Sequence, residues 1–174
     1  EVRSEAAAAL ARPDGRLVTR WLDQSRISTF RYSFTPNLET YIAGRRSGGC
    51  ELRNTKDQTL LQFFPHEPKG STKTARELDR AVFSRDGRRF AVCYGDQSLD
   101  VWDRDIASPL LKLPPKSLTS YALDFSTDGK QLVYCTSDGL VAHSLEEGNR
   151  RVLLPPEIHV RFVRLDPAGQ RMMI

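Results

Sequence analysis

Short apolar runs alternate with turn residues along most of the chain. The runs are rich in Val, Leu, Phe, Tyr and Cys, and Asp-Gly or Pro-Pro pairs separate them. Residues of the first kind favour β-strands, whereas Gly and Pro interrupt them. Asp86-Gly87 and Asp128-Gly129 supply the left-handed backbone that a tight hairpin needs. The pattern therefore predicts short antiparallel strands joined by hairpins.

Prolines mark the ends of the predicted outer strands. Leu110–Leu113 is followed by Pro114-Pro115, and Arg151–Leu154 is followed by Pro155-Pro156. Because proline cannot donate to a strand ladder, it fits where a strand ends and the chain crosses elsewhere. No long amphipathic helix pattern interrupts these units, which argues against a parallel α/β sheet. We expect an all-β fold.

The strand pattern repeats with a period near 42 residues. Gly87 and Gly129 are 42 residues apart, a third copy opens at Val160, and a divergent earlier copy opens at Arg31. This period is typical of β-propeller blades, each with about four short strands. The sequence predicts four-stranded antiparallel blades at residues 29–65, 79–114 and 120–155, and an incomplete blade at 159–174.

One unit resembles a WD-repeat blade through Phe83-Ser84-Arg85-Asp86-Gly87 and the ending Leu99-Asp100-Val101-Trp102-Asp103. The next unit is similar over Phe125–Gly129, but His143-Ser144 occupies the Trp-Asp place. In the earliest copy that place holds Arg53-Asn54. The Gly-His dipeptide common in WD repeats is missing before every first strand. Bacterial propellers related to TolB share the Ser-x-Asp-Gly signature, so the propeller subtype stays open.

The leader carries a second resemblance. Residues 1–13 are rich in helix formers, and Pro13-Asp14-Gly15 ends the predicted helix. Residues 14–28 contain a run, Arg16–Trp21, that alternates like a strand. The arrangement resembles a junction in large bacterial signalling proteins, where a Ser/Thr kinase or related module precedes a WD-repeat propeller. The resemblance implies that this strand closes the ring; the alternative is pairing with any free sheet edge.

The predicted ring is partial. Propellers have about four to eight blades, and this sequence holds about three and a half. A ring that stops in mid-blade leaves unpaired strand edges. We therefore expect the remaining blades to lie beyond Ile174, or a second copy of the chain to complete the ring.

The composition is that of an ordinary globular chain of about one domain, with 174 residues, 39% hydrophobic and 28% charged. The net charge of +4 is scattered along the chain, so nucleic acid is not an expected partner. No apolar run approaches the roughly 18 residues of a membrane helix. The charged start, Glu1–Glu5, does not resemble a signal peptide. We expect no membrane association and a cytoplasmic location.

Candidate chemistry is sparse. Cys50, Cys93 and Cys135 have neither C-x-x-C spacing nor a nearby His, which predicts no metal site and a reducing compartment. His66 and His159 stand beside prolines in connections, where we expect solvated side chains. No hydrolase elbow, zincin motif or phosphate-binding glycine loop occurs. The sequence predicts no enzyme activity in this segment and no cofactor.

Several polar or reactive residues have a structural explanation. His143 is predicted to fill a Trp-shaped slot, and Ser144 points to the opposite strand face, so the two form no catalytic dyad. Cys93 and Cys135 fall in neighbouring blades, too far apart for a disulfide, and are expected to pack as small apolar groups. The turn carboxylates are expected to accept hydrogen bonds from nearby backbone amides. They are Asp96, Asp128 and Asp138.

The candidate binding surface is a set of basic residues that we call the basic rim. The connection Pro65–Asp79 is longer than the later crossings and emerges at the same edge as the turns between second and third strands. We expect this edge to dock an acidic segment of a protein or peptide, or another domain of the same chain. The alternative is a solvated loop without a ligand. The basic rim consists of Arg45, Arg46, Lys69, Lys73, Arg76 and Lys116.

The sequence thus predicts a non-catalytic WD40-like propeller segment. Its expected role is a protein-interaction or sensing scaffold within a larger bacterial regulatory protein. The alternative is an accessory propeller domain of an enzyme, either Ser/Thr kinase-linked or of the TolB/peptidase-propeller type. A periplasmic TolB-like binder is a third possibility.

Overall fold

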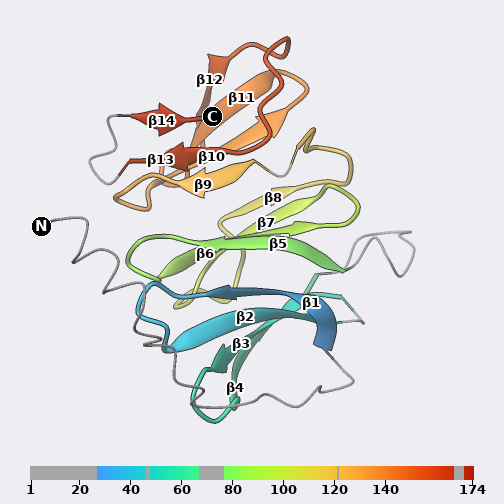
Figure 1. The fold of residues 1–174 in the computed structure, drawn as a ribbon, viewed down its shortest axis with the longest axis vertical. Helices are drawn as coiled ribbons and strands as arrows, with labels where there is room; N and C mark the ends of the chain where they lie inside the picture. The colour runs from blue at the N-terminus through green and yellow to red at the C-terminus, as the bar shows by residue number, and fades with distance from the viewer. Residues whose placement is uncertain (1–26, 46–47, 67–76, 121, 167–170) are drawn as a thin grey trace, which may run out of the picture.

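The computed structural model describes residues 27–45, 48–66, 77–120, 122–166 and 171–174. Within these ranges every regular element is a β-strand, and the strands form separate antiparallel sheets (Figure 1). The prediction of an all-β fold with four-stranded sheets is confirmed. The predicted helix at 1–13 and the alternating run at Arg16–Trp21 lie outside the described residues. Among the described residues, no helix is long and apolar enough to cross a membrane.

Each of the first three sheets is a meander whose strand order follows the sequence. Sheet 1 contains β1 (Ile27–Phe34), β2 (Thr40–Arg45), β3 (Cys50–Asn54) and β4 (Leu60–Phe64). Sheet 2 contains β5 (Leu78–Phe83), β6 (Arg89–Tyr94), β7 (Leu99–Asp103) and β8 (Leu111–Leu113). Sheet 3 contains β9 (Leu123–Phe125), β10 (Gln131–Thr136), β11 (Gly139–Ser144) and β12 (Arg150–Leu154). Sheet 4 contains β13 (Arg164–Leu165) and β14 (Met172–Met173).

In every sheet the same pair of hydrogen bonds closes the connection between the first two strands. The residue that opens the turn donates its backbone N–H to the carbonyl five positions later, at 2.9 Å in all four sheets. The later residue returns an N–H to the side-chain oxygen of the opening residue, at 2.9–3.1 Å. The predicted repeat therefore holds at atomic level, including its divergent first copy and its short last copy. The opening residues are Thr35, Ser84, Ser126 and Asp166.

Apolar cores lie between successive sheets, because neighbouring residues on a central strand point to opposite faces. On β6, Phe90 and Val92 face sheet 1, whereas Ala91 and Cys93 face sheet 3. A third core joins sheet 3 to sheet 4 through residues such as Cys135. The backbones of successive sheets approach along their first strands, with β1 against β5, β5 against β9, and β9 against β13 (Figure 1).

The turns of each meander alternate between two edges of the stack. We call one edge the hairpin rim, formed by the turns between first and second strands and between third and fourth strands. The opposite edge, the crossover rim, carries the turns between second and third strands. It also carries the segments that cross from a fourth strand to the next sheet. The described residues of the crossings are 65, 66 and 77 in the first, 114–120 and 122 in the second, and 155–163 in the third.

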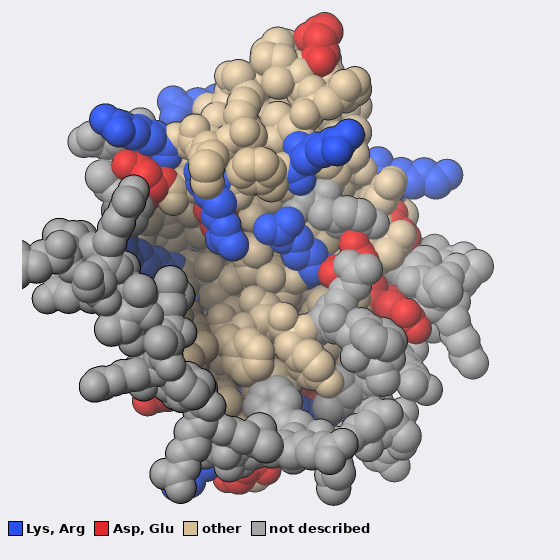
Figure 2. Space-filling model, in the orientation of Figure 1, with Lys and Arg blue, Asp and Glu red and all other residues tan. Residues whose placement is uncertain are grey.

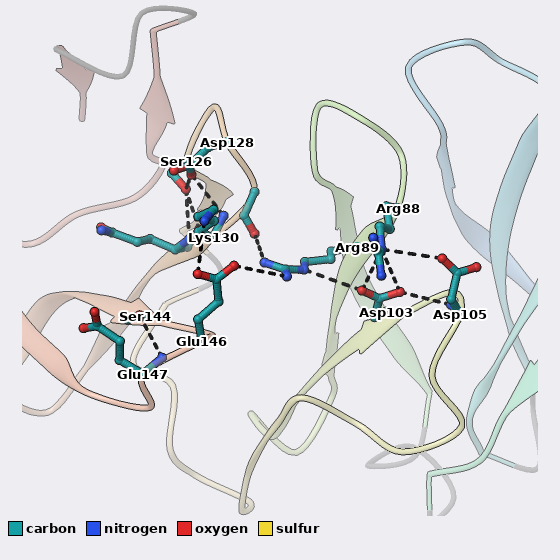
Figure 3. Close-up of polar contacts among 12 residues, drawn as sticks. Arg88, Arg89, Asp103, Asp105, Ser126, Asp128, Lys130, Ser144, Glu146 and Glu147 are labelled. Carbon is teal, nitrogen blue, oxygen red and sulfur yellow. Dashed lines mark hydrogen bonds and ion pairs between the residues drawn. The ribbon is translucent and has the colours of Figure 1, made fainter.

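Ion pairs on the hairpin rim tie sheet 2 to sheet 3. Arg89 donates to the carbonyl oxygen of Gly129 at 2.8 Å and lies 3.8 Å from the carboxylate of Glu146. On its other side Arg89 forms an ion pair with Asp103 (Figure 3), and the two side chains are 3.7 Å apart. The Asp103 carboxylate is only 1% exposed, and Arg88 also binds it, at 2.9 Å. Two guanidinium groups therefore compensate one buried charge, and Arg89 reaches the next sheet as well.

Candidate functional site

The structure describes two members of the basic rim, and both lie on the crossover rim. Arg45 ends β2 in sheet 1, and Lys116 lies in the crossing that follows β8 of sheet 2. The other four members lie outside the described residues. They are Arg46, Lys69, Lys73 and Arg76.

Arg45 is committed to the fold of sheet 1. Its Nε donates to the carboxylate of Glu51, and its guanidinium lies over the ring of Phe63, 4.5 Å from the centroid. Glu51 is only 2% exposed, and Arg53 also donates to it at 2.6 Å. Because a buried carboxylate needs compensating donors, Arg45 acts first as a structural partner of Glu51.

Lys116 is free to meet a ligand. Its backbone adopts a left-handed conformation with φ of 63°, and its N–H donates to the carbonyl oxygen of Asp96 at 2.8 Å. This bond fastens the crossing to the β6–β7 turn. The exposed ammonium group has no ion pair among the residues that the structure describes. A binding role for Lys116 stays a prediction.

The prediction that His66 is solvated is wrong. His66 is only 7% exposed, and its Nδ1 lies 2.8 Å from Oδ2 of Asp100 on β7. Its Nε2 lies 3.4 Å from the hydroxyl of Ser98. The imidazole stacks on the ring of Tyr94, with centroids 3.5 Å apart and planes within 9°. His66 therefore anchors the start of the first crossing to sheet 2.

A sequence signal for this contact does exist. Asp100 is the second residue of β7, a strand whose five residues are all buried. A carboxylate there needs a hydrogen-bond donor from outside its own strand. The chain has three histidines that could donate this hydrogen bond, and His66 is the one that precedes sheet 2 in the sequence. The signal identifies the need for a donor but not the donor itself.

The distances in this cluster are similar to those of a Ser–His–Asp relay, but its surroundings do not suit nucleophilic catalysis. Ser98 is 1% exposed, and its hydroxyl donates to the carboxylate of Asp96 at 2.5 Å. A nucleophile must reach a substrate and pass its proton to the base. Burial keeps the Ser98 hydroxyl from reaching a substrate, and its hydrogen bond to Asp96 competes with proton transfer to His66. Burial, with the nearby Cys50 and Asp100, also holds the pKa of Tyr94 well above its usual value.

The other histidines follow their predictions. His143 is half-buried in the slot that corresponds to Trp102, and its Nδ1 lies 3.0 Å from the hydroxyl of Tyr134. Burial and the nearby Arg150 lower the pKa of His143. Trp102 itself is 2% exposed and packs against Phe64, with ring centroids 5.2 Å apart. His159 is exposed.

All three cysteines are free and buried. Cys93 packs between sheets 2 and 3 and Cys135 between sheets 3 and 4, as small apolar groups. Burial raises the pKa of Cys93 to about 12. Burial raises the pKa of Cys50 more than it raises that of Cys93, and the Asp100 carboxylate contributes to the increase. In the described part of the chain, no cluster of three or more His, Cys, Asp or Glu side chains is placed to hold a metal ion.

Two of the three turn carboxylates bind backbone amides as predicted. Asp96 accepts from the N–H of Ser98 at 3.0 Å, and Asp128 accepts from the N–H of Lys130 at 3.0 Å. Asp138 differs, because its carboxylate pairs with the guanidinium of Arg150 at 2.8 Å. Arg150 pairs with His143 at the other end of β11, so the residues around the turn give no sign of this ion pair.

Comparisons with known proteins identify no family. Neither the models of protein families nor the curated protein sequences contain a match to this chain. The assignment of a function therefore depends on the geometry described above.

Proposed function

We propose that this chain forms part of a WD-repeat-like β-propeller and serves as a non-catalytic scaffold for protein interactions. The observation that carries the proposal is the recurrence of one turn in all four sheets, combined with close approach along the first strands. Sheets arranged radially around an axis approach one another at their innermost strands. Blades that shield their apolar faces by stacking on a neighbour account for both features.

The second sheet supports the WD-repeat subtype over the TolB-related one. Its Trp102-Asp103 ending is fully buried, and Asp103 is held by Arg88 and Arg89. His66 supplies a buried histidine ahead of the first strand, although Pro65 precedes it in place of the family's Gly. These features extend the resemblance beyond the residues that first indicated it.

The distribution of uncommitted polar groups favours binding over catalysis. The buried carboxylates of Asp100 and Glu51 are held by partners. Lys116, in contrast, lies in a rim segment and has an unpaired charge among the described residues. A rigid support that presents variable loops is the usual design of interaction domains. We propose a larger regulatory protein as the setting of this scaffold, because the leader resembles a junction in bacterial signalling proteins.

The charge pattern favours an acidic protein or peptide as the partner. In Figure 2 the basic side chains near the height of β5 and β9 form separate groups with uncharged surface between them, and they do not form a continuous basic stripe. Nucleic-acid backbones bind to clustered Lys and Arg that neutralise successive phosphates. A short acidic peptide needs only a few cationic contacts at the crossover rim.

Binding to immobilised peptides of acidic, neutral and basic composition tests the proposal. We expect retention of the acidic peptides and a decline with rising salt, because salt screens exposed charges. Lys116→Glu and Lys73→Glu should each weaken retention. Lys56→Glu is the matched control, because Lys56 is exposed on a turn of the hairpin rim. Equal retention of all three peptide classes, or equal effects of the three variants, would contradict the proposal.

A further inference from the structure

The crossings to the next sheet close in different ways. In the first, His66 is buried against Tyr94 of the following sheet. In the second, Leu118 donates its N–H to the carbonyl oxygen of Gln97 at 3.1 Å. The Leu118 side chain is 2% exposed and fills the core between sheets 2 and 3. Both crossings are therefore fastened at the rim by a buried side chain.

The third crossing is closed by packing but not by a hydrogen bond to its sheet. Val160 is 7% exposed and packs in the core between sheets 3 and 4. It begins with Pro155-Pro156 as the second begins with Pro114-Pro115, and Val160 follows Leu118 by 42 residues, the spacing of the repeat. His159 is exposed, and among the described residues it makes no hydrogen bond to sheet 3. Among the described residues, no backbone hydrogen bond joins this crossing to the β10–β11 turn, whereas the bond from Leu118 to Gln97 joins the second crossing to the β6–β7 turn.

A pocket of about 490 Å³ occupies this place, between the third crossing and the β10–β11 turn. We call it the third-crossing pocket. One wall carries hydroxyl groups, including that of Ser137, and the other carries His159 and Arg161. Ile158 and Cys135 add apolar surface. The pocket thus combines an aliphatic part with donors of hydrogen bonds.

Three polar side chains of this pocket have no partner among the described residues. They are Ser137, His159 and Arg161. The neighbouring hydroxyl of Thr119, in contrast, donates to the carbonyl oxygen of Thr136 at 3.2 Å. No carboxylate is among the described residues lining this pocket. Elsewhere in the described part of the chain, six guanidinium groups pair with carboxylates, those of Arg45, Arg53, Arg88, Arg89, Arg150 and Arg164. A free guanidinium beside a free hydroxyl is suited to bind an anion.

The nearest acidic turn residue does not cancel this charge. Asp138 follows Ser137 directly, but its carboxylate pairs with Arg150 at 2.8 Å. Arg161 therefore keeps its charge available to a ligand. One guanidinium and a few hydroxyl groups suit a singly charged carboxylate. Phosphate groups carry more charge and are commonly bound by clusters of arginines.

We propose that the third-crossing pocket binds a carboxylate side chain of an acidic peptide. Arg161 forms the ion pair, Ser137 donates a hydrogen bond, and Ile158 contacts an aliphatic residue next to the acid. This inference rests on the proposed scaffold function and assigns a chemistry to one place on its rim. It adds a site to the basic rim, because none of these residues belongs to that set.

Nuclear magnetic resonance titration of the full chain with two short peptides tests the site. The probes are acetyl-Glu-Leu-Glu-Leu-amide and its matched analogue with Gln in place of Glu. We expect saturable shifts of the backbone amides of Ser137 and Gly139 and of the Arg161 Nε–H with the Glu peptide. The Gln peptide should bind about tenfold or more weakly, since a hydrogen bond to a charged group is lost.

Substitutions separate the pocket from the rest of the surface. Arg161→Ala should weaken binding of the Glu peptide about tenfold, and Ser137→Ala should weaken its binding severalfold. Arg151→Ala is the control, because Arg151 is exposed on β12 and lies outside the pocket. All of these side chains are exposed, so unchanged circular dichroism is expected and verifies the fold of each variant.

The outcomes separate this inference from the proposed function. Equal binding of the Glu and Gln peptides would overturn the carboxylate site, as would tighter binding of a phosphoserine peptide or of inorganic phosphate. Shifts confined to the neighbourhood of Lys116 would overturn the pocket but leave the scaffold function intact. The peptide-retention experiment addresses the scaffold function by itself, and its failure would remove both.

Discussion

At the scale of single residues, Leu38 occupies a backbone position that glycine occupies in the following copies. It stands third after Thr35, as Gly87 stands third after Ser84, and their φ angles are 59° and 70°. A left-handed conformation costs a residue with a Cβ about 1–2 kcal/mol, because the Cβ approaches the following carbonyl oxygen. Leu38 is 65% exposed, so burial compensates little of this cost.

Replacing Leu38 by glycine should therefore stabilise the fold. We expect Leu38→Gly to raise the free energy of unfolding by about 0.5–1 kcal/mol, since glycine's greater backbone entropy offsets part of the relief. Gly87→Leu should lower it by about 1 kcal/mol or more. Urea unfolding followed by circular dichroism measures both. A loss of stability in Leu38→Gly would contradict the assignment of strain to this position.

His66 is the second residue whose role can be measured. His66→Ala should lower the free energy of unfolding by about 2–4 kcal/mol, because it leaves the Asp100 carboxylate buried without its donor. His159→Ala is the control, and its effect should stay within about 0.5 kcal/mol because His159 is exposed. Urea unfolding midpoints compare the two variants. Equal effects would argue against a structural role for His66.

At the scale of elements, the Ser-x-Asp turn is the repeated local structure. In its third copy the Ser126 hydroxyl and the Lys130 amide lower the pKa of Asp128 by hydrogen bonding. In the second copy burial pushes the pKa of Asp86 upward, but hydrogen bonds from Ser84 and the Arg88 amide outweigh it, and the net shift is downward. In both of these copies an ionised carboxylate thus stabilises the turn.

These shifts give the turns a defined dependence on pH. A carboxyl group whose folded pKa is depressed stabilises the fold above its unfolded pKa of about 3.9, and that stability is lost as pH falls through the folded pKa. Asp86→Asn with Asp128→Asn should therefore reduce stability at neutral pH, by at most about 1 kcal/mol because both sites are near solvent. The difference from the parent chain should disappear in acid.

A direct test of the cause is Ser126→Ala. Removal of the hydroxyl should move the pKa of Asp128 upward toward its ordinary value, as measured by nuclear magnetic resonance titration of the carboxyl carbon. An unchanged pKa would mean that the Lys130 amide alone stabilises the charge.

At the scale of the whole molecule, stacking of successive sheets provides the core. Equivalent residues of neighbouring sheets enter successive cores, as Cys93 and Cys135 do. The outward face of sheet 4 exposes Phe162 and Met173. Met173 occupies the position of Ala91, which faces the following sheet in the second copy. This face therefore resembles the faces that pair elsewhere in the stack.

Thiol reactivity reports on this stacking. Because burial raises the pKa of Cys93 to about 12 and also raises that of Cys135, neither forms appreciable thiolate near neutral pH. We expect no rapid reaction with Ellman's reagent in the native state and reaction of all three cysteines in urea. Cys135 should react first on partial opening, since it lines the third-crossing pocket. Rapid native reaction of Cys93 would contradict packing between the sheets.

The amino-acid pattern alone determined the strands, the Asp-Gly hairpins, the repeat and the apolar packing of Cys93 and Cys135. It could do so because strand alternation and turn hydrogen bonds act over a few residues, as in the pair formed by Ser84 and Arg89. The domain limits and the ring remain predictions.

The tertiary structure decided which polar groups are bound and which are free. His66 meets Asp100 from 34 positions away, and Arg45 is bound by a carboxylate that its own sheet buries. The opening between the third crossing and sheet 3 lies where, among the described residues, no backbone hydrogen bond joins the crossing to the β10–β11 turn. Such contacts join segments distant in sequence, and local pattern carries no information on which donor reaches which acceptor. The packing of the sheets decides which donor reaches which acceptor.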